Sequence, residues 1–168
     1  CGLSLGGMIA QWLGAHAPAR VDRLVLACTA PYIGPPAGWQ TRIDAVRTHG
    51  MSALADAVLA RWLTPAFVAR APRAAATLRA MLLATPPDGY AGCCAAIRDM
   101  DLRPSAARIA RPTLLVAGMH DPVTPPEQVD ALAEAIRRGG APTRVVRLDG
   151  AHLANVEQPE AFAGAVLE

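Results

Sequence analysis

The sequence contains no lysine, and all 16 of its basic residues are arginine. These arginines are spread between Arg20 and Arg147, and the longest basic run is the pair Arg137 and Arg138. Because no basic stripe could follow a phosphate backbone, a nucleic-acid partner is not expected. Charged residues make up only 18% of the chain and hydrophobic residues 52%, which excludes an intrinsically disordered protein.

Long apolar runs and targeting signals are also lacking. No apolar stretch approaches the roughly 18 residues that a membrane span needs, so no membrane partner is expected. The chain starts at Cys1 without a charged n-region or a cleavage site, so no secretory signal is visible. The four cysteines, Cys1, Cys28, Cys93 and Cys94, have neither zinc-site nor disulfide-framework spacing. We expect free buried thiols and no metal or other cofactor.

Three short apolar segments indicate a buried parallel sheet. Residues 21–28, 112–118 and 143–148 are nearly continuous or alternating apolar runs that end at turn residues. An amphipathic helical pattern separates the second segment from the third. This strand, helix and strand order predicts a βαβ unit, and hence an α/β fold with a mostly parallel sheet.

The helix between the second and third strands has clear signals at both ends. Thr124 is predicted to be its N-cap, with Pro125 at the first helical position and Glu127 completing a capping box. Gly139 and Gly140 are predicted to end it.

Residues 31–104 interrupt the alternation of strands and helices. They have helical periodicity and no convincing strand, and prolines divide them into about four helices. The chain is therefore divided into core residues 1–30, a helical insert at 31–104, and core residues 105–168. Within the insert, Trp39 and Arg42 are three positions apart and are expected to share a helical face.

The first residues carry a motif with a chemical meaning. Gly2-Leu3-Ser4-Leu5-Gly6 matches the G-x-S-x-G nucleophile elbow. A serine on a tight strand-to-helix turn is strained, and side chains two positions away on either side would collide, which explains Gly2 and Gly6. The following helix favours negative charge at its N-terminus, and the backbone N–H of Leu5 is predicted to be an oxyanion donor. The alternative is that Ser4 is an ordinary helix cap.

Asp121 follows the second predicted strand, and His152 follows the third. Open α/β sheets place their active sites at the carboxyl ends of parallel strands. Ser4, Asp121 and His152 also occur in the chain order of the elbow motif, so we predict that they form a catalytic triad. The alternatives are that Asp121 starts a turn and that His152 is a solvated loop residue. The remaining histidines are predicted to have structural roles: His16, His49 and His120.

These residues resemble the α/β-hydrolase superfamily. Residues 118–125 are similar to its acid loop, and residues 150–153 with 157–159 to its histidine loop. Residues 1–8 and 89–101 are similar to the 3-oxoadipate enol-lactonases. The resemblance implies an α/β-hydrolase fold in which the helical insert is a cap over the strand ends. Members of the family have further strands before the elbow, so the resemblance also implies that this chain is a fragment.

The resemblance implies a serine hydrolase that opens 3-oxoadipate enol-lactone to 3-oxoadipate through an acyl-enzyme. Such enzymes work in the cytoplasm, in the β-ketoadipate pathway of aromatic degradation, without a cofactor. The partner would be a small lactone that carries a carboxylate, for which Trp39 and Arg42 could supply an aromatic wall and a cation. The alternative for these two residues is packing for Trp39 and solvent exposure for Arg42. The alternative functions are another esterase, a haloperoxidase-like enzyme, or an inactive fragment; the sequence does not indicate an oligomeric state.

Overall fold

The computed structural model describes residues 1–168 and separates into two compact units. The first unit consists of Cys1–Tyr32 and Asp101–Glu168, and the second of Ile33–Met100. The second unit lies just inside the expected insert at 31–104. The N–H of Leu102 donates to the carbonyl of Pro31, and this bond joins the two chain segments of the first unit that flank the second unit. None of the helices combines the length and the apolarity that crossing a bilayer demands.

A four-stranded sheet forms the centre of the first unit, and every neighbouring pair of strands is parallel. In sheet order the strands are β1 (Gly2–Leu3), β2 (Leu24–Ala27), β3 (Thr113–Gly118) and β4 (Thr143–Leu148). The predicted α/β fold is confirmed, with β2, β3 and β4 as the three predicted strands.

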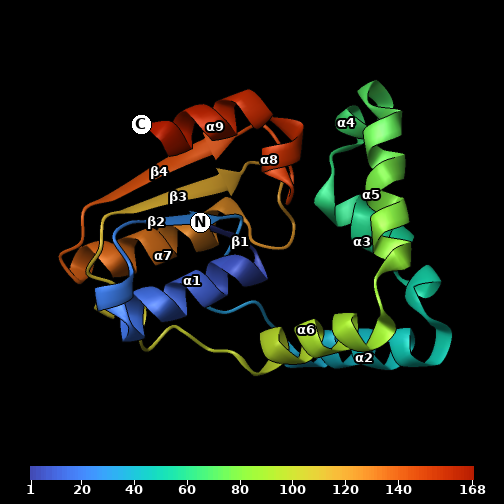
Figure 1. The fold of residues 1–168 in the computed structure, drawn as a ribbon, viewed down its shortest axis with the longest axis horizontal. Helices are drawn as coiled ribbons and strands as arrows, with labels where there is room; N and C mark the ends of the chain where they lie inside the picture. The colour runs from blue at the N-terminus through green and yellow to red at the C-terminus, as the bar shows by residue number, and fades with distance from the viewer. The chain divides into compact units, whose positions relative to one another are not determined.

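Helices cover both faces of this sheet (Figure 1). One face packs against α1 (Leu5–His16) and α7 (Pro126–Arg138), and the other against α9 (Pro159–Leu167). The short helix α8 (Ala154–Glu157) precedes α9, and single 3-10 turns lie at Pro18–Arg20 and Ala106–Arg108.

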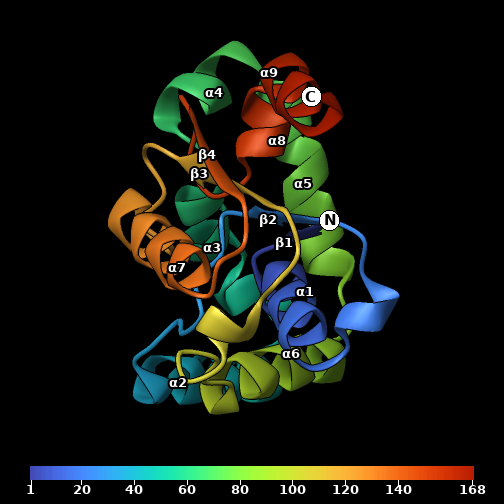
Figure 2. The ribbon, with the colours of Figure 1, turned by 90° about the vertical axis from the view of Figure 1, so that its left-hand side faces the viewer.

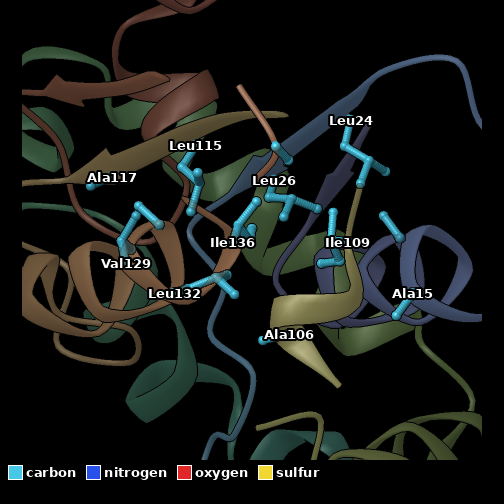
Figure 3. Close-up of a cluster of buried hydrophobic side chains, with 13 residues drawn as sticks. Ala15, Leu24, Leu26, Ala106, Ile109, Leu115, Ala117, Val129, Leu132 and Ile136 are labelled. Carbon is cyan, nitrogen blue, oxygen red and sulfur yellow. The ribbon is translucent and has the colours of Figure 1, made fainter. Parts of the chain in front are cut away.

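The sheet's two faces follow from the alternation of side chains along each strand. Leu24 and Leu26 of β2 and Leu115 of β3 belong to the cluster with α1 and α7 (Figure 3). The residues between them, such as Val25 and Leu114, belong to the cluster on the opposite face. Because β2 and β3 are apolar on both sides, each forms part of two hydrophobic layers.

The predicted start of α7 is wrong by about one residue. Its N-cap is Pro125, no side chain caps it, and Pro126 is the first helical residue. Thr124 lies one position before the cap, and its hydroxyl donates to Oδ2 of Asp121, at 2.7 Å. The predicted end is confirmed: the helix ends at Arg138, and Gly140 follows with a φ of 89°.

The second unit is helical throughout. Its helices are α2 (Pro36–His49), α3 (Ala55–Trp62), α4 (Pro65–Arg70), α5 (Pro72–Ala84) and α6 (Pro87–Asp99), with a 3-10 turn at Met51–Ala53. Four of these five helices begin with proline, as the proline pattern predicts. The additional break falls at Gly50, whose φ is 70°, so it depends on a glycine that the proline pattern does not reveal.

The helices α2 and α6 run side by side in Figure 1 and Figure 2, and both contribute to the core of the second unit. Its buried residues come from all parts of the unit except α4: Ile43, Val46, Met51, Ala55, Val58, Leu82, Ala91 and Cys94. The unit therefore has a hydrophobic core of its own.

Candidate active site

Ser4 lies in the turn between β1 and α1, with φ 54° and ψ −118°. A residue other than glycine adopts such a conformation at a cost of roughly 1–3 kcal/mol. Gly2 makes the turn possible, because a Cβ there would lie 2.1 Å from the carbonyl oxygen of Gly6. The steric explanation for Gly6 is wrong, since a Cβ at that position would meet nothing within 4 Å. The second crowded glycine is Gly7, where a Cβ would lie 2.6 Å from the side chain of Thr29.

The structure brings Ser4, His152 and Asp121 together. The Ser4 hydroxyl is 2.8 Å from Nε2 of His152, and Nδ1 of His152 is 2.7 Å from Oδ2 of Asp121. Because an ionised carboxylate only accepts hydrogen bonds, Nδ1 carries the proton and Nε2 can accept from the Ser4 hydroxyl. The Ser4 side chain does not cap α1, and His152 is only 3% exposed. The alternatives of a helix cap and a solvated histidine are therefore wrong.

Asp121 is buried and accepts several hydrogen bonds. Its Oδ1 accepts from the backbone N–H groups of Val123 and Thr124, at 2.7 and 3.1 Å. Asp121 therefore also starts a turn, as the alternative interpretation of this residue expected. Burial acts to raise the pKa of Asp121, but the hydrogen bond and charge of His152 and the bonds from Thr124 outweigh it and hold this pKa below its ordinary value. Asp121 is therefore ionised at neutral pH and can orient the imidazole.

The loop that carries His152 is fixed by its backbone. Gly118, at the end of β3, allows a close approach, since a Cβ there would lie 2.2 Å from the carbonyl oxygen of Ala151. The N–H of Ala151 donates to Oε1 of the buried Glu157, at 2.8 Å. Sequence reasoning included Glu157 only within the family motif. What identifies Glu157 as an acceptor is the burial of its carboxylate, and this burial is visible only in the tertiary structure.

The first turn of α1 contains no acidic side chain. Leu5 is the first residue of α1, so its N–H has no acceptor within the helix. In the absence of an acidic side chain, the partial positive charge of the helix end is not neutralised there. The role of Leu5 as an oxyanion donor stays a prediction that this arrangement favours.

A family model described as the alpha/beta hydrolase fold matches residues 1–159. The chain belongs to the α/β-hydrolase family. The matched segment includes the elbow, the acid loop and the histidine loop, which are the three parts of the chain that meet at Ser4.

Similar proteins match this α/β-hydrolase chain over most of its length. It is 39% identical to 3-oxoadipate enol-lactonase 2 of Acinetobacter baylyi, over 99% of this chain and 61% of that protein. The crystal structure of the enol-lactonase from Burkholderia xenovorans LB400 matches with a TM-score of 0.95 and 42% identity, over 99% of this chain and 63% of that one. A pimeloyl-(acyl-carrier protein) methyl ester esterase of Nitrosomonas europaea is 32% identical, over 82% of this chain and 58% of that protein. The chain thus spans about three fifths of the length of these proteins.

Cys28 follows β2 in this α/β-hydrolase chain and is close enough to Asp121 to feel its charge. Burial raises the pKa of the Cys28 thiol to about 12, and the negative charge of Asp121 acts in the same direction. Since the thiolate is the nucleophilic form, the Cys28 thiol is a poor nucleophile at neutral pH. All four cysteines are free, but the expectation of burial is wrong for Cys1 and Cys93, which are exposed.

Two of the other three histidines have side chains with local partners. Nδ1 of His16 lies 3.0 Å from the carbonyl oxygen of Trp12, on which its ring stacks, and Nε2 of His120 lies 2.8 Å from Oδ1 of Asp149. His49 is an exposed residue at the end of α2. None of the three is hydrogen-bonded to Ser4, and no group of three or more His, Cys, Asp or Glu side chains is arranged to hold a metal ion.

Trp39 and Arg42 share a face of α2 in the second unit. The Arg42 guanidinium carbon lies 4.7 Å from the centroid of the Trp39 ring, and Nε1 of Trp39 donates to the carbonyl of Ile33, at 2.5 Å. Burial raises the pKa of Tyr90, and the charge and hydrogen bond of Arg42 oppose this shift. Arg42 is half-buried and forms no ion pair with an acidic side chain. Trp39 packs against the core of the second unit, as the alternative for this residue expected, while Arg42 is partly buried and not simply solvent-exposed. The roles of both residues in binding stay predictions.

Proposed function

We propose that the protein is a serine hydrolase that opens 3-oxoadipate enol-lactone to 3-oxoadipate, with Ser4, His152 and Asp121 as its catalytic triad. The observation that carries the proposal is the chain of hydrogen bonds from Asp121 through His152 to Ser4, at 2.7 and 2.8 Å. The strained turn of Ser4 at a helix N-terminus supports the role of nucleophile. The similarity to enol-lactonases supports the choice of substrate.

Acylation begins with proton transfer from the Ser4 hydroxyl to Nε2 of His152 as Oγ forms a bond to the lactone carbonyl carbon. The carbonyl oxygen becomes an oxyanion, which the N–H of Leu5 and the N-terminus of α1 stabilise. Asp121 holds Nδ1–H and stabilises the imidazolium that forms.

Collapse of this intermediate breaks the bond between the carbonyl carbon and the ring oxygen. His152 gives its proton to that oxygen, and the released enol tautomerises to a ketone. A water molecule, deprotonated by His152, then attacks the acyl-enzyme and regenerates Ser4. Every step is a proton transfer or an acyl transfer, so these residues suffice without a cofactor.

The free carboxylate of the lactone calls for a cation, because burying a charge without a partner is costly. We propose that Arg42, supported by Trp39, is this cation. A guanidinium can bind a carboxylate through two parallel hydrogen bonds, and Arg42 has no acidic side chain to occupy it. Within this chain, which contains no lysine, arginine is the cationic side chain available for this role at neutral pH.

Replacing Arg42 with alanine is expected to raise KM for the enol-lactone by about 10- to 100-fold, the effect of losing a charged hydrogen bond. KM for an uncharged ester such as p-nitrophenyl acetate should change little. The matched control is Arg47→Ala, which removes an exposed arginine from the same helix and should leave both values unchanged. An equal rise in KM for both substrates would show that Arg42 supports the helical unit and does not bind the carboxylate.

The proposed reaction is tested by comparing kcat/KM of the whole protein for the enol-lactone, a dicarboxylate monomethyl ester and p-nitrophenyl acetate. We expect the highest value for the enol-lactone, with 3-oxoadipate identified by NMR as the product. The similarity to a pimeloyl methyl ester esterase favours methyl ester hydrolysis as the second candidate, and a higher value for the methyl ester would select it. If a fluorophosphonate label does not react with Ser4, the protein is an inactive member of the fold.

A further inference from the structure

A buried polar chain connects the inside of α1 to the backbone of Ser4. Nε2 of Gln11 donates to Oγ1 of Thr29, at 3.3 Å, and to the carbonyl oxygen of Ala30, at 3.2 Å. The Thr29 hydroxyl in turn donates to the carbonyl oxygen of Ser4, at 2.8 Å. Gln11 and Thr29 are each only 1% exposed, so water does not replace these bonds.

The direction of these bonds is fixed by chemistry. The carbonyl of Ala30 can only accept, so the nitrogen of the Gln11 amide must face it. The same nitrogen donates to Oγ1 of Thr29, which leaves the single hydroxyl hydrogen of Thr29 for the Ser4 carbonyl. Oε1 of Gln11 has no partner. A buried amide oxygen without a partner is unfavourable for stability. The presence of Gln11 at this place therefore indicates a role for the two hydrogen bonds that its NH2 group donates.

The Ser4 carbonyl belongs to the same planar peptide group as the N–H of Leu5. In a trans peptide these two bonds point in opposite directions, so a hydrogen bond that fixes one of them also fixes the other. The Ser4 carbonyl accepts from the N–H of Met8, at 3.0 Å, and from the Thr29 hydroxyl. These two donors hold the orientation of the Leu5 N–H, which is the proposed oxyanion donor.

The local backbone is shaped to bring Thr29 to this place. Ser4 and Cys28 are the only residues other than glycine with a positive φ, and Cys28 directly precedes Thr29. The absence of a side chain at Gly7 lets Thr29 pack against the first turn of α1, since a Cβ there would lie 2.6 Å from Thr29. Backbone strain at two connected positions is typical of a functional site.

We propose that Thr29 is a positioning residue of the oxyanion hole, and that Gln11 directs its hydroxyl toward the Ser4 carbonyl. The inference rests on the proposed role of Ser4 as nucleophile and does not depend on which ester is the natural substrate. Thr29 touches no reacting atom in this scheme. It acts through the peptide group between Ser4 and Leu5.

The test compares Thr29→Val, which keeps the shape and removes the hydroxyl, with Thr29→Ser, which keeps the hydroxyl. For Thr29→Val we expect kcat for p-nitrophenyl acetate to fall by about 10- to 100-fold, less than the loss of an oxyanion donor itself, with KM nearly unchanged. The affinity for an alkyl boronic acid, which forms a tetrahedral adduct with Ser4, should fall in parallel with kcat. Thr29→Ser should restore both values to near those of the unaltered protein.

A merely structural role predicts a different set of results. Equal losses in Thr29→Val and Thr29→Ser, or a fall in kcat without a fall in boronic acid affinity, would overturn the proposal. If Thr29→Val does not fold, Gln11→Leu provides the second variant, and unchanged kcat there would also overturn the role given to Gln11. Esterase activity that survives Ser4→Ala would refute the proposed function itself. That result is independent of the Thr29 variants, so the two proposals can fail separately.

Discussion

Replacement of Ser4 with alanine is expected to lower kcat by at least about 10³-fold while the melting temperature changes little. In the proposed mechanism the hydroxyl attacks the carbonyl carbon, and alanine at the same turn should leave the packing of the elbow unchanged. His152→Ala and Asp121→Asn should also lower kcat severely, because each breaks the chain of hydrogen bonds at 2.8 or 2.7 Å. The measurements are steady-state kinetics with the enol-lactone and thermal unfolding.

Double variants give a stricter test of this triad. Members of a triad act as a unit, so Ser4→Ala combined with His152→Ala should be hardly slower than Ser4→Ala alone. Ser52→Ala, which removes an exposed hydroxyl in the second unit, is the matched control and should retain full activity. Enol-lactone hydrolysis by Ser4→Ala at a rate near that of the unaltered protein would contradict the assignment, as would losses that simply multiply in the double variant.

The triad could be predicted from the sequence because each member stands at a position that the sequence marks. Ser4 lies in a local motif, and Asp121 and His152 lie in the loops that follow β3 and β4. Parallel strands bring their carboxyl ends to one edge of a sheet, so recognising the strands also predicts that these loops meet. The hydrogen-bonding distances then follow from the fold.

The residues that support the triad could not be predicted in the same way. Thr124 has the sequence pattern of an N-cap, yet its hydroxyl donates to Asp121, because a buried carboxylate attracts the nearest donor. Thr29 and Gln11 have no local signal, since their partners are distant in the sequence. Glu157 lies in the family motif, but its bond to the N–H of Ala151 depends on how the histidine loop folds. Gly6 fits the motif but is not crowded, whereas Gly7 is, because the obstacle is the side chain of Thr29 in the loop after β2.

Gly118→Ala is expected to have the second largest effect, on both activity and stability. A Cβ at Gly118 would lie 2.2 Å from the carbonyl oxygen of Ala151 and 2.8 Å from that of Gly150. Both obstacles are backbone atoms, and neither can turn aside as a flexible side chain would. The loop is also held from both sides, since the N–H of His120 donates to Gly150 and the N–H of Ala151 donates to Glu157. Relief of the clash must therefore move the loop that carries His152.

A displacement of about 1 Å in a catalytic group lowers the rate by roughly 100-fold, so we expect at least that loss in kcat for Gly118→Ala. Overpacking against rigid backbone should also lower the free energy of unfolding by about 1–3 kcal/mol, measured by urea denaturation. The matched control is Gly164→Ala in α9, where a Cβ meets nothing within 4 Å. It should raise stability by about 0.5–1 kcal/mol, because alanine favours a helix over glycine, and leave kcat unchanged. Unchanged kcat and stability in Gly118→Ala would mean that the histidine loop can shift freely, and that the distance between His152 and Ser4 does not depend on the tight contact between β3 and this loop.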